Sequence, residues 1–449
     1  MELSPALQEH LKIYKLISEK IKHDINYELI FFITKKFREN IVRGFEDKGD
    51  YKIICKRILD EFDNYFLNNS REKILLEIEE FQQIHISEKN VKPKILSIND
   101  TNFNKAAELL KNGELVAFPT ETVYGLGANG LNSEAVKLIY KWKGRPSNNP
   151  VILHVAKMQD IYNLVDISSR MINIINIIGE KFWPGPLTIV VKASDIVPLE
   201  VTANTGFVGI RIPNDSVALK LLDKCDFPIA APSANLSGHV SPTNYSHVYI
   251  DFINKPLTIL EDSENYSKRI GIESSIIKIE ESFTSSVKLT VLRSGFIGGQ
   301  SIKQTLEDNG FSVELIYYER VATDEEILDA PGQLFRHYAP NINAFVHNSN
   351  SKNYIKTSKL KNYVILGSNK SLYQYKDTCL EYIDIGNNVF DVAKNLYDCL
   401  RKAEDNLSAN GIIISIELMH ECFDINTDIK IAILDKLMRC TEAKSIFIK

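Results

Sequence analysis

From about residue 96 onward, the sequence alternates between strand-like and helix-like segments, and few architectures accommodate such an alternation. Short runs rich in β-branched residues alternate with longer runs whose apolar residues recur at steps of three and four. Glycine and proline concentrate between them, so we expect an α/β domain with elaborated loops, where sites are usually built. The predicted strands are residues 115–118, 151–155, 187–192, 208–212, 274–279 and 288–292. The predicted helices are residues 132–143, 169–181 and 216–224.

Two further regions flank this domain. Residues 1–95 show amphipathic helical spacing, almost no glycine or proline, and equal numbers of basic and acidic residues. We expect a helical cap, oligomerisation arm or packing unit there and see no chemistry in it. Residues 342–449 alternate again, with strands predicted at 363–366, 411–415 and 445–448 and helices at 389–403 and 430–438. Between the two α/β regions, residues 317–341 predict a linker that either docks on another surface or packs on its own domains, because aromatic and charged residues lie between prolines.

Composition limits the class of protein. The chain has 449 residues and a formal net charge of −5, which argues against a strongly basic protein that coats nucleic acid. No apolar run approaches the roughly 20 residues that a spanning helix needs, and the N-terminus lacks a signal pattern. The six cysteines are scattered without a CxxC pair, which fits a reducing compartment and predicts a cytoplasmic protein without membrane association.

Several motifs resemble catalytic signatures but lack their context. Residues 125–130 match GxGxxG, yet the acidic residue that a dinucleotide fold needs about 20 positions later is missing, so we expect turn glycines. His420 and Glu421 begin like a zinc-protease motif, but position 424 is Asp. The sequence contains no GxxxxGK[ST] and no GxSxG, so neither a P-loop nor a nucleophile elbow is expected.

Four polar stretches in the middle region lie at predicted strand or helix ends: residues 119–127, 141–154, 230–243 and 271–275, the last followed by 292–295. Taken singly, each is also typical of caps, turns and surface charge. Together they supply cations and hydroxyls without an evident Ser–His–Asp set, which predicts binding of a polyphosphate and a small carboxylate, with catalysis by positioning and charge neutralisation. The cations are Lys143, Arg145, Arg211 and Arg293, and the hydroxyls are those of Thr120, Thr122, Ser233, Ser241 and Ser274. Arg211 interrupts an apolar strand, so we expect it to meet an anion or a carboxylate.

At these residues the chain resembles the threonylcarbamoyl-AMP synthase family, with its YrdC-like domain, in the long two-domain form. The motifs that carry the resemblance are PTETVYGLG (119–127), KxRP with NP (143–150), His154, WPGPLT (183–188), RxP (211–213), APSANLSG with SPT (231–243), GIESS (271–275), LRSG (292–295) and PGxxxRHYAP (331–340). The resemblance implies a YrdC-like twisted open α/β sheet domain at 96–316, a linker or lid at 317–341 and a small Rossmann-like α/β C-terminal domain at 342–449. Residues 1–95, the all-α N-terminal extension, match nothing in the family.

The resemblance implies a nucleotidyltransferase that makes threonylcarbamoyl-adenylate and pyrophosphate from L-threonine, bicarbonate or CO2, and ATP, with Mg²⁺ carried on the phosphates. A separate tRNA threonylcarbamoyl-transferase complex would then modify tRNA to threonylcarbamoyladenosine (t6A), and direct binding of tRNA stays open. The threonine end would be lined by Thr122, His154, Arg211, Ala231 and Ser274. The ATP end would be lined by Arg145, Asn149, Ser233, Ser241, Arg293 and Tyr338. The family's KxR…SxN catalytic set would be Lys143, Arg145, Ser233 and Asn235.

The chain departs from the family pattern at Ser275, Ser294, Gln333, Leu334 and Phe335, and Phe207 stands where a threonine is frequent. Two alternatives remain open at the level of the sequence. One is an RNA-binding YrdC-like module without catalysis, and the other is a related carbamoyl transferase with another substrate.

Overall fold

The computed structural model describes residues 92–262, 269–281, 286–318, 337–368, 371–406, 408–415 and 427–449. The chain divides into two compact units, Met1–Lys92 and Pro93–Lys449, and the described elements belong to the second. The predicted helical extension therefore lies almost entirely outside the described residues. Most of the predicted linker, including residues 331–336 of its motif, lies outside them as well.

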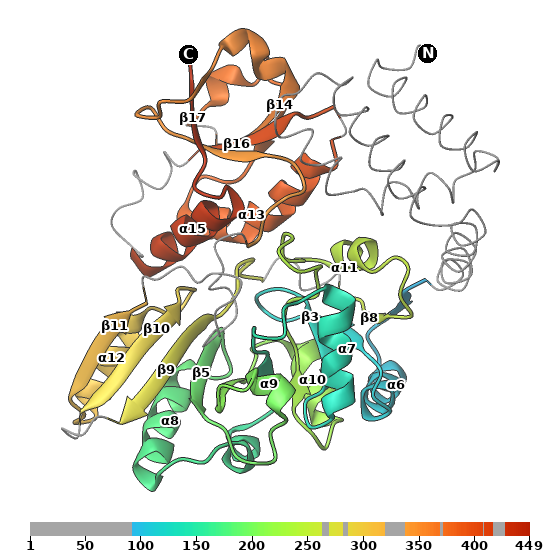
Figure 1. Cartoon of the computed structure of the whole chain (residues 1–449), viewed down its shortest axis with the longest axis vertical. Coiled ribbons are helices and arrows are strands. Elements are labelled where there is room, and N and C mark those ends of the chain that lie inside the picture. Colours follow the sequence, from blue (N-terminus) through green and yellow to red (C-terminus); the bar gives the residue numbers. More distant parts are fainter. Residues whose placement is uncertain are drawn as a thin grey trace, which may run out of the picture. The chain divides into compact units, whose positions relative to one another are not determined.

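The described part of the second unit contains two separate β-sheets (Figure 1). The larger sheet has eleven strands in the order β1-β8-β2-β3-β7-β4-β6-β5-β9-β10-β11 and mixes parallel with antiparallel neighbours. Its strands are β1 (Lys94–Leu96), β2 (Val116–Phe118), β3 (Gly125–Asn129), β4 (Ile152–His154), β5 (Leu187–Lys192), β6 (Phe207–Arg211), β7 (Ile229–Ala230), β8 (Thr258–Leu260), β9 (Ser275–Glu281), β10 (Val287–Arg293) and β11 (Val313–Tyr317). This arrangement confirms a mixed α/β class.

Helices connect and cover these strands. They are α6 (Asp100–Lys111), α7 (Ser133–Lys143), α8 (Ser169–Phe182), α9 (Leu199–Thr202), α10 (Ser216–Asp223), α11 (Tyr245–Asp251) and α12 (Gly299–Asp308), with a 3₁₀ helix at Met158–Leu164. Helix α8 illustrates why they form where they do. Ser168 caps it by accepting from the amide of Met171, and Ile174, Ile175 and Ile178 present one apolar face to the core.

The smaller sheet belongs to the C-terminal region and is parallel at every pairing, in the order β13-β17-β12-β16-β14-β15. Its strands are β12 (Ala344–His347), β13 (Tyr354–Ile355), β14 (Tyr363–Gly367), β15 (Glu381–Asp384), β16 (Gly411–Ser415) and β17 (Ser445–Ile448). The helices of this region are α13 (Val389–Glu404) and α15 (Thr427–Cys440), with 3₁₀ turns at Thr357–Asn362 and Tyr373–Tyr375. The parallel sheet agrees with the prediction, but its strand order differs from the 3-2-1-4-5-6 order of the classical Rossmann fold.

Every strand and helix predicted between residues 115 and 448 lies on an element of the same type, and residues 187–192, 411–415 and 445–448 match β5, β16 and β17 end to end. The prediction that the glycines of residues 125–130 lie in a turn is wrong for Gly125 and Gly127, because residues 125–129 form β3. A Cβ on Gly127 would lie 2.9 Å from the Phe118 ring and 3.0 Å from the Val116 carbonyl, so close packing between strands explains that glycine.

Two predicted domain boundaries cut through strands. The boundary at residue 96 falls inside β1, whose Lys94 and Ile95 pair with Thr258 and Ile259 of β8. The boundary at residue 316 falls inside β11, which pairs with β10 as far as Tyr317. Within the described residues, no helix combines the length and the apolar character that crossing a bilayer requires.

Candidate active site

One cavity in the described part of the chain brings together residues from motifs far apart in the sequence. It is lined by residues at strand ends, by the loops after β2 and β7, and by His337 and Tyr338 near the end of the predicted linker. Its free volume is about 50 Å³, whereas pockets for drug-sized ligands measure about 300–1,000 Å³. A nucleotide could therefore enter only if lining side chains move.

Nine of the predicted site residues line this cavity: Thr122, Arg145, His154, Arg211, Ala231, Ser233, Ser274, Arg293 and Tyr338. Four others are buried but do not line it: Lys143, Asn149, Asn235 and Ser241. Their hydrogen bonds, described below, show that they hold neighbouring groups instead.

The loop between β2 and β3 forms a compact polar turn. The Thr120 and Thr122 hydroxyls are 2.8 Å apart, and Thr120 also donates to the Val123 carbonyl at 2.7 Å. Arg211, at the end of β6, donates to the Thr122 hydroxyl at 3.0 Å and pairs with the Glu121 carboxylate at 2.7 Å. The expectation that this arginine meets a carboxylate is confirmed, although the sequence did not identify Glu121 as the partner. Because both side chains are buried, the pair fixes the direction of the guanidinium.

His154 ends β4 directly beside Arg211, since the two residues are register partners in parallel strands. Its ring meets Phe118 edge-on, with ring centroids 6.2 Å apart. Burial, with a smaller contribution from Arg211, lowers the pKa of His154 to about 3, so the imidazole is neutral at physiological pH. Its Nδ1 is buried and has no hydrogen-bond partner among the described residues. A neutral ring with an unused nitrogen is suited to accept a hydrogen bond from a ligand.

Arg145 follows helix α7, which ends at Gly144 with a left-handed φ of 62°. Its Nε donates to the Asn149 carbonyl at 3.0 Å, and its Nη2 donates to the Pro150 carbonyl at 2.7 Å and to the Asn149 amide oxygen. Burial lowers the pKa of Arg145 to about 10, which still leaves it charged. Three of its five donors hold the proline-bounded turn, so the guanidinium is fixed at the cavity wall.

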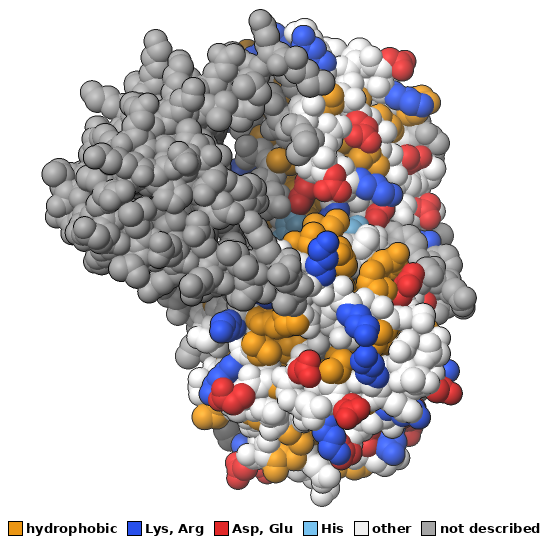
Figure 2. All heavy atoms as spheres, turned by 90° about the vertical axis from the view of Figure 1, so that its right-hand side faces the viewer, with side chains coloured by type: hydrophobic (Ala, Val, Ile, Leu, Met, Phe, Trp, Pro, Cys, Tyr) orange, Lys and Arg blue, Asp and Glu red, His pale blue; other side chains and the backbone are white. Residues whose placement is uncertain are grey.

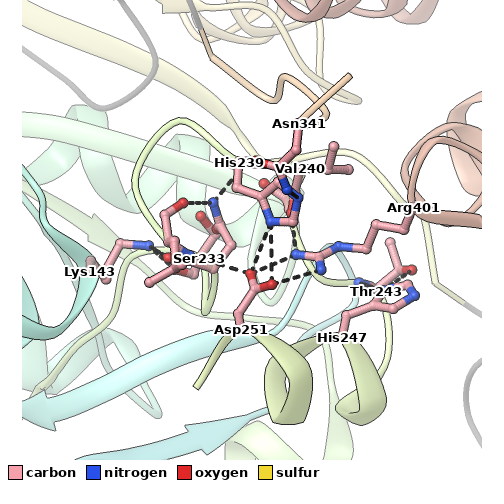
Figure 3. A network of polar contacts seen from close by, with 12 residues as sticks. Lys143, Ser233, His239, Val240, Thr243, His247, Asp251, Asn341 and Arg401 are labelled. Carbon is pink, nitrogen blue, oxygen red and sulfur yellow. Dashed lines mark hydrogen bonds and ion pairs between the residues drawn. The ribbon is translucent and has the colours of Figure 1, made fainter. Parts of the chain in front are cut away.

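Lys143 does not enter the cavity. Its Nζ donates to the carbonyls of Ser233 and Asn235, so the lysine holds the loop after β7 in place (Figure 3). Burial drives the pKa of Lys143 well below its usual value, and the charge of Arg145 adds to that effect. One of the four cations expected from the sequence is therefore buried and holds the backbone of a loop.

Arg293 reaches the cavity from the end of β10. Its Nε donates to the Ser274 carbonyl at 3.0 Å and its Nη2 to the Ser274 hydroxyl at 3.1 Å. That hydroxyl also lies 2.9 Å from the Thr188 hydroxyl. The GIESS and LRSG motifs thus form one unit, in which Ser274 fixes the guanidinium of Arg293, the third one at the cavity.

Sequence reasoning missed the importance of Glu273, a buried carboxylate that lines the cavity. Its Oε1 accepts from Ser241 at 2.5 Å and its Oε2 from Tyr397 of α13 at 2.7 Å. The acidic residue inside GIESS was the available signal. Nothing in the sequence marked Tyr397, because it lies 124 residues away in a helix without a motif.

Tyr338 is fully buried, has a left-handed φ of 60° and stacks on Tyr397 with ring centroids 5.6 Å apart. Its hydroxyl has no hydrogen-bond partner among the described residues, and burial raises its pKa well above the usual value. His337 packs beside it, and burial lowers the pKa of that imidazole well below its usual value.

A second, larger cavity of about 360 Å³ lies elsewhere in the described part of the chain. Its lining includes Leu131, Lys157, Cys225 and Phe227 and none of the predicted site residues. Burial raises the pKa of Cys225 to about 12, so this thiol is not a reactive thiolate. The smaller cavity remains the candidate site.

Comparison with known proteins places these features in context. Residues 108–295 match the Sua5/YciO/YrdC family model, described as "Telomere recombination", and residues 297–441 match the model "Threonylcarbamoyl-AMP synthase, C-terminal domain". The threonylcarbamoyl-AMP synthase of Pyrococcus abyssi is 35% identical over 328 residues, which cover 70% of this chain and 90% of that protein. The enzyme of Bacillus subtilis is 39% identical over 247 residues, covering 55% and 66% respectively. A crystal structure of P. abyssi Sua5 complexed with L-threonine superposes with a TM-score of 0.65 at 29% identity, covering 80% of this chain and 99% of that one.

Proposed function

Since the chain belongs to the threonylcarbamoyl-AMP synthase family, an enzyme family, we propose that its arginine-lined cavity joins L-threonine, bicarbonate or CO2, and ATP. The products are threonylcarbamoyl-adenylate and pyrophosphate. One observation carries the placement: Arg145, Arg211 and Arg293, from three separate motifs, converge on a single cavity. Substrates that bear a carboxylate and a triphosphate need this concentration of fixed positive charge.

The threonine end is assigned to Thr122, His154, Arg211, Ala231 and Ser274. Arg211 binds the amino-acid carboxylate in this proposal, because its Nε is buried without a partner among the described residues while its Nη2 is held by Thr122. Neutral His154 accepts a hydrogen bond at its unused Nδ1 from the threonine amine or hydroxyl. The P. abyssi structure with L-threonine supports an amino-acid subsite in this fold.

The ATP end is assigned to Arg145, Asn149, Ser233, Ser241, Arg293 and Tyr338. Arg145 and Arg293 meet the phosphates directly, since both line the cavity. Asn149 acts by fixing Arg145, and Ser241 acts by fixing Glu273. Tyr338 moves to admit ATP, because the cavity is too small for a nucleotide while that ring lines it.

The reaction needs no covalent enzyme intermediate. The threonine amine attacks the carbon of CO2, or of bicarbonate with loss of water, and loses a proton as the carbamate forms. A carbamate oxygen then attacks the α-phosphorus of ATP, and the bond from that phosphorus to pyrophosphate breaks. The guanidinium groups hold the reactants in place and neutralise the charge that develops on the leaving pyrophosphate.

Mg²⁺ enters this proposal only as a companion of the ATP phosphates. Within the described residues, no group of three or more His, Cys, Asp or Glu side chains is arranged to hold a metal ion. Both oxygens of Glu273, the carboxylate at the cavity, already accept hydrogen bonds from Ser241 and Tyr397.

The catalytic domain of the proposal is the region built on the eleven-stranded sheet, and residues 342–449 form the smaller domain. A separate tRNA threonylcarbamoyl-transferase complex would take up the product. On the described part of the face in Figure 2, basic and acidic side chains are interspersed rather than gathered by sign. This pattern does not favour the alternative of an RNA-binding module on that face.

Pyrophosphate release tests the proposal. The full chain is supplied with ATP, Mg²⁺, bicarbonate and L-threonine, and each substrate is then omitted in turn. We expect release only with the complete set, because the carbamate must form before it attacks ATP. No release from the complete set contradicts the proposal, and faster release with L-serine or another amine would favour the related carbamoyl transferase.

A further inference from the structure

The loop between β7 and α11 carries Ser233 of the proposed ATP end and Asn235 of the proposed catalytic set, and hydrogen bonds tie its residues 233–239 together. Lys143 holds the carbonyls of Ser233 and Asn235 at the beginning of the loop. The Asn235 amide then donates to the Leu236 carbonyl at 2.7 Å and to the His239 carbonyl at 2.8 Å. Any displacement of His239 is therefore transmitted to Asn235 and to the backbone that bears Ser233.

Asp251, the last residue of α11, is the centre of a buried polar network (Figure 3). Its side chain is 3% exposed. The carboxylate accepts from the Leu236 amide at 3.3 Å and lies 3.3 Å from Nδ1 of His239. The Asp251 carboxylate thus contacts the loop at two residues, Leu236 and His239.

The C-terminal domain contributes the other half of the network. Arg401 of α13 forms a two-pronged pair with Asp251, at 3.0 Å from Nη1 and 2.8 Å from Nη2, and also donates to the Val240 carbonyl. Glu404, one turn further along α13, lies 2.6 Å from Nε2 of His239. Glu404 also accepts from the amide of Asn341, the last residue of the predicted linker, at 3.0 Å. The smaller domain therefore contacts the loop directly at His239 and Val240.

The charges in this network alternate along the chain of contacts: Glu404, His239, Asp251, Arg401. Burial opposes protonation of His239, but its hydrogen bonds to Asp251 and Glu404 outweigh burial and raise its pKa to about 9. Despite burial, the same histidine and Arg401 lower the pKa of Asp251 to about 2. At neutral pH the four groups carry two positive and two negative charges, so loss of one leaves an uncompensated buried charge.

Helix α13 is shaped for this contact. Tyr397, Arg401 and Glu404 are spaced i, i+4 and i+7, so they lie on one face of the helix. The same face passes so close to the catalytic domain that a Cβ on Gly271 would lie 2.4 Å from the Lys394 carbonyl. On this face Tyr397 also donates to Glu273 at the cavity. Helix α13 thus contacts two loops of the candidate site, the 233–240 loop and the loop that carries Gly271 and Glu273.

We infer that α13 positions the 233–240 loop for ATP, and that Arg401 is a positioning residue acting through Asp251 and His239. The inference rests on the proposed function, since it assumes that this loop meets the nucleotide. It gives the C-terminal domain a part in nucleotide binding beyond any support of the linker. Within the threonine end, His154 and Arg211 lie on β4 and β6 and take no part in this network, so we expect a larger effect on ATP than on L-threonine.

The test uses Arg401→Gln in the full chain, with pyrophosphate release measured at varied ATP and at varied L-threonine. We expect kcat/KM for ATP to fall about tenfold or more, because Asp251 loses its two-pronged partner. The KM for L-threonine should change less than about twofold. Arg401→Lys should restore part of the loss, since an ammonium can pair with Asp251 but cannot form both contacts.

Lys402→Gln is the matched control, because it removes the same charge from the next position of α13. That side chain is 63% exposed and pairs with Asp398 of its own helix, so parental kinetics are expected. Parental kinetics in Arg401→Gln would overturn the inference. A uniform loss of kcat with both KM values unchanged would overturn it as well, since that pattern reflects fewer folded molecules.

Failure of the proposed function is distinguishable from failure of the inference. If the parent chain releases no pyrophosphate, the proposed function fails. The inference is then tested by measuring the Kd for ATP with titration calorimetry. Arg401→Gln should then weaken the Kd for ATP about tenfold or more relative to the parent and to Lys402→Gln. Equal affinity in all three proteins, or no ATP binding by the parent, overturns the inference.

Discussion

At the scale of single residues, the candidate site depends on charged side chains that are buried and paired before any substrate arrives. Arg211 and Glu121 form such a pair, with side chains 5% and 8% exposed. Arg145 and Arg293 are fixed in the same way by backbone carbonyls. Fixed charges cost little reorganisation when a transition state develops, which is why positioning can replace a nucleophile here.

Replacing Glu121 by alanine should therefore destabilise the protein strongly. The change leaves the Arg211 charge buried without its carboxylate, and breaking a buried pair from one side costs about 3–5 kcal/mol. The measurement is the free energy of unfolding from urea titration.

Asp166→Ala serves as the control, because its pair with Lys192 has both side chains 63% exposed. An exposed pair contributes at most about 1 kcal/mol. Equal effects of the two substitutions would show that the buried pair has no special weight.

Arg145→Ala should abolish adenylate formation and leave the Tm within a few degrees of the parent, because Arg145 lines the cavity. Lys143→Ala should lower both activity and Tm, since its ammonium holds two carbonyls beneath the loop. Activity assays beside thermal unfolding separate the two cases. Normal turnover by the Arg145 variant would remove this residue from the site.

At the scale of elements, glycines mark the places where backbones approach closely. Gly127 lets β3 lie between β2 and β7, and Gly271 lets α13 pass over the GIESS loop. Gly271 also has a φ of +83°, which a residue with a Cβ adopts only at a cost. Part of the GIESS motif therefore reflects contact between domains.

Gly271→Ala should lower the free energy of unfolding by more than Gly206→Ala does. Both positions have a left-handed φ, but a Cβ at Gly206 has no atom within 4 Å, whereas one at Gly271 meets the Lys394 carbonyl at 2.4 Å. Gly206→Ala should cost about 1 kcal/mol through backbone strain alone. Gly271→Ala adds to the same strain an overpacking cost of about 1–3 kcal/mol. Urea titration of both variants decides, and equal losses would contradict a tight contact at Gly271.

The elements that the sequence predicted well are those with continuous apolar periodicity, such as β5 and α8, because their burial pattern is written in the sequence. Strand β3 was missed because its glycines and alanine carry no such pattern. The arginines of the site were found from their motifs. Two buried partnerships were not found, that of Arg211 with Glu121 and that of Glu273 with Tyr397. The partners lie 90 and 124 positions apart in the sequence, and only the fold brings them together.

At the scale of the whole second unit, the smaller domain contacts the catalytic domain through buried ionic groups as well as apolar packing. The network of Arg401, Asp251, His239 and Glu404 joins the two regions. Lys436 of α15 adds a further contact, donating to the Ser294 carbonyl at 2.9 Å. Because one of these groups is a histidine, we expect the contact between the domains to depend on pH.

The histidine's contribution to stability should fall as pH rises. Hydrogen bonds to Asp251 and Glu404 raise the pKa of His239 to about 9 in the folded protein, against about 6.5 when unfolded. Its contribution is therefore complete below pH 6.5, declines from there to pH 9 and is lost above, and amounts to at most about 3 kcal/mol. The measurement is the difference in unfolding free energy between the parent and His239→Asn across pH 5.5–9.5. A difference that stays constant or grows with pH would contradict the protonated network.

The most direct test of the central claim identifies the product. The full chain is incubated with ATP, Mg²⁺, L-threonine and ¹³C-bicarbonate, and the mixture is analysed by mass spectrometry beside the Arg211→Ala variant. We predict threonylcarbamoyl-adenylate with one ¹³C atom from the parent, and a large loss of that product at limiting L-threonine from the variant. Pyrophosphate or AMP without the labelled adenylate, or equal product from both proteins, would contradict the assignment of this cavity.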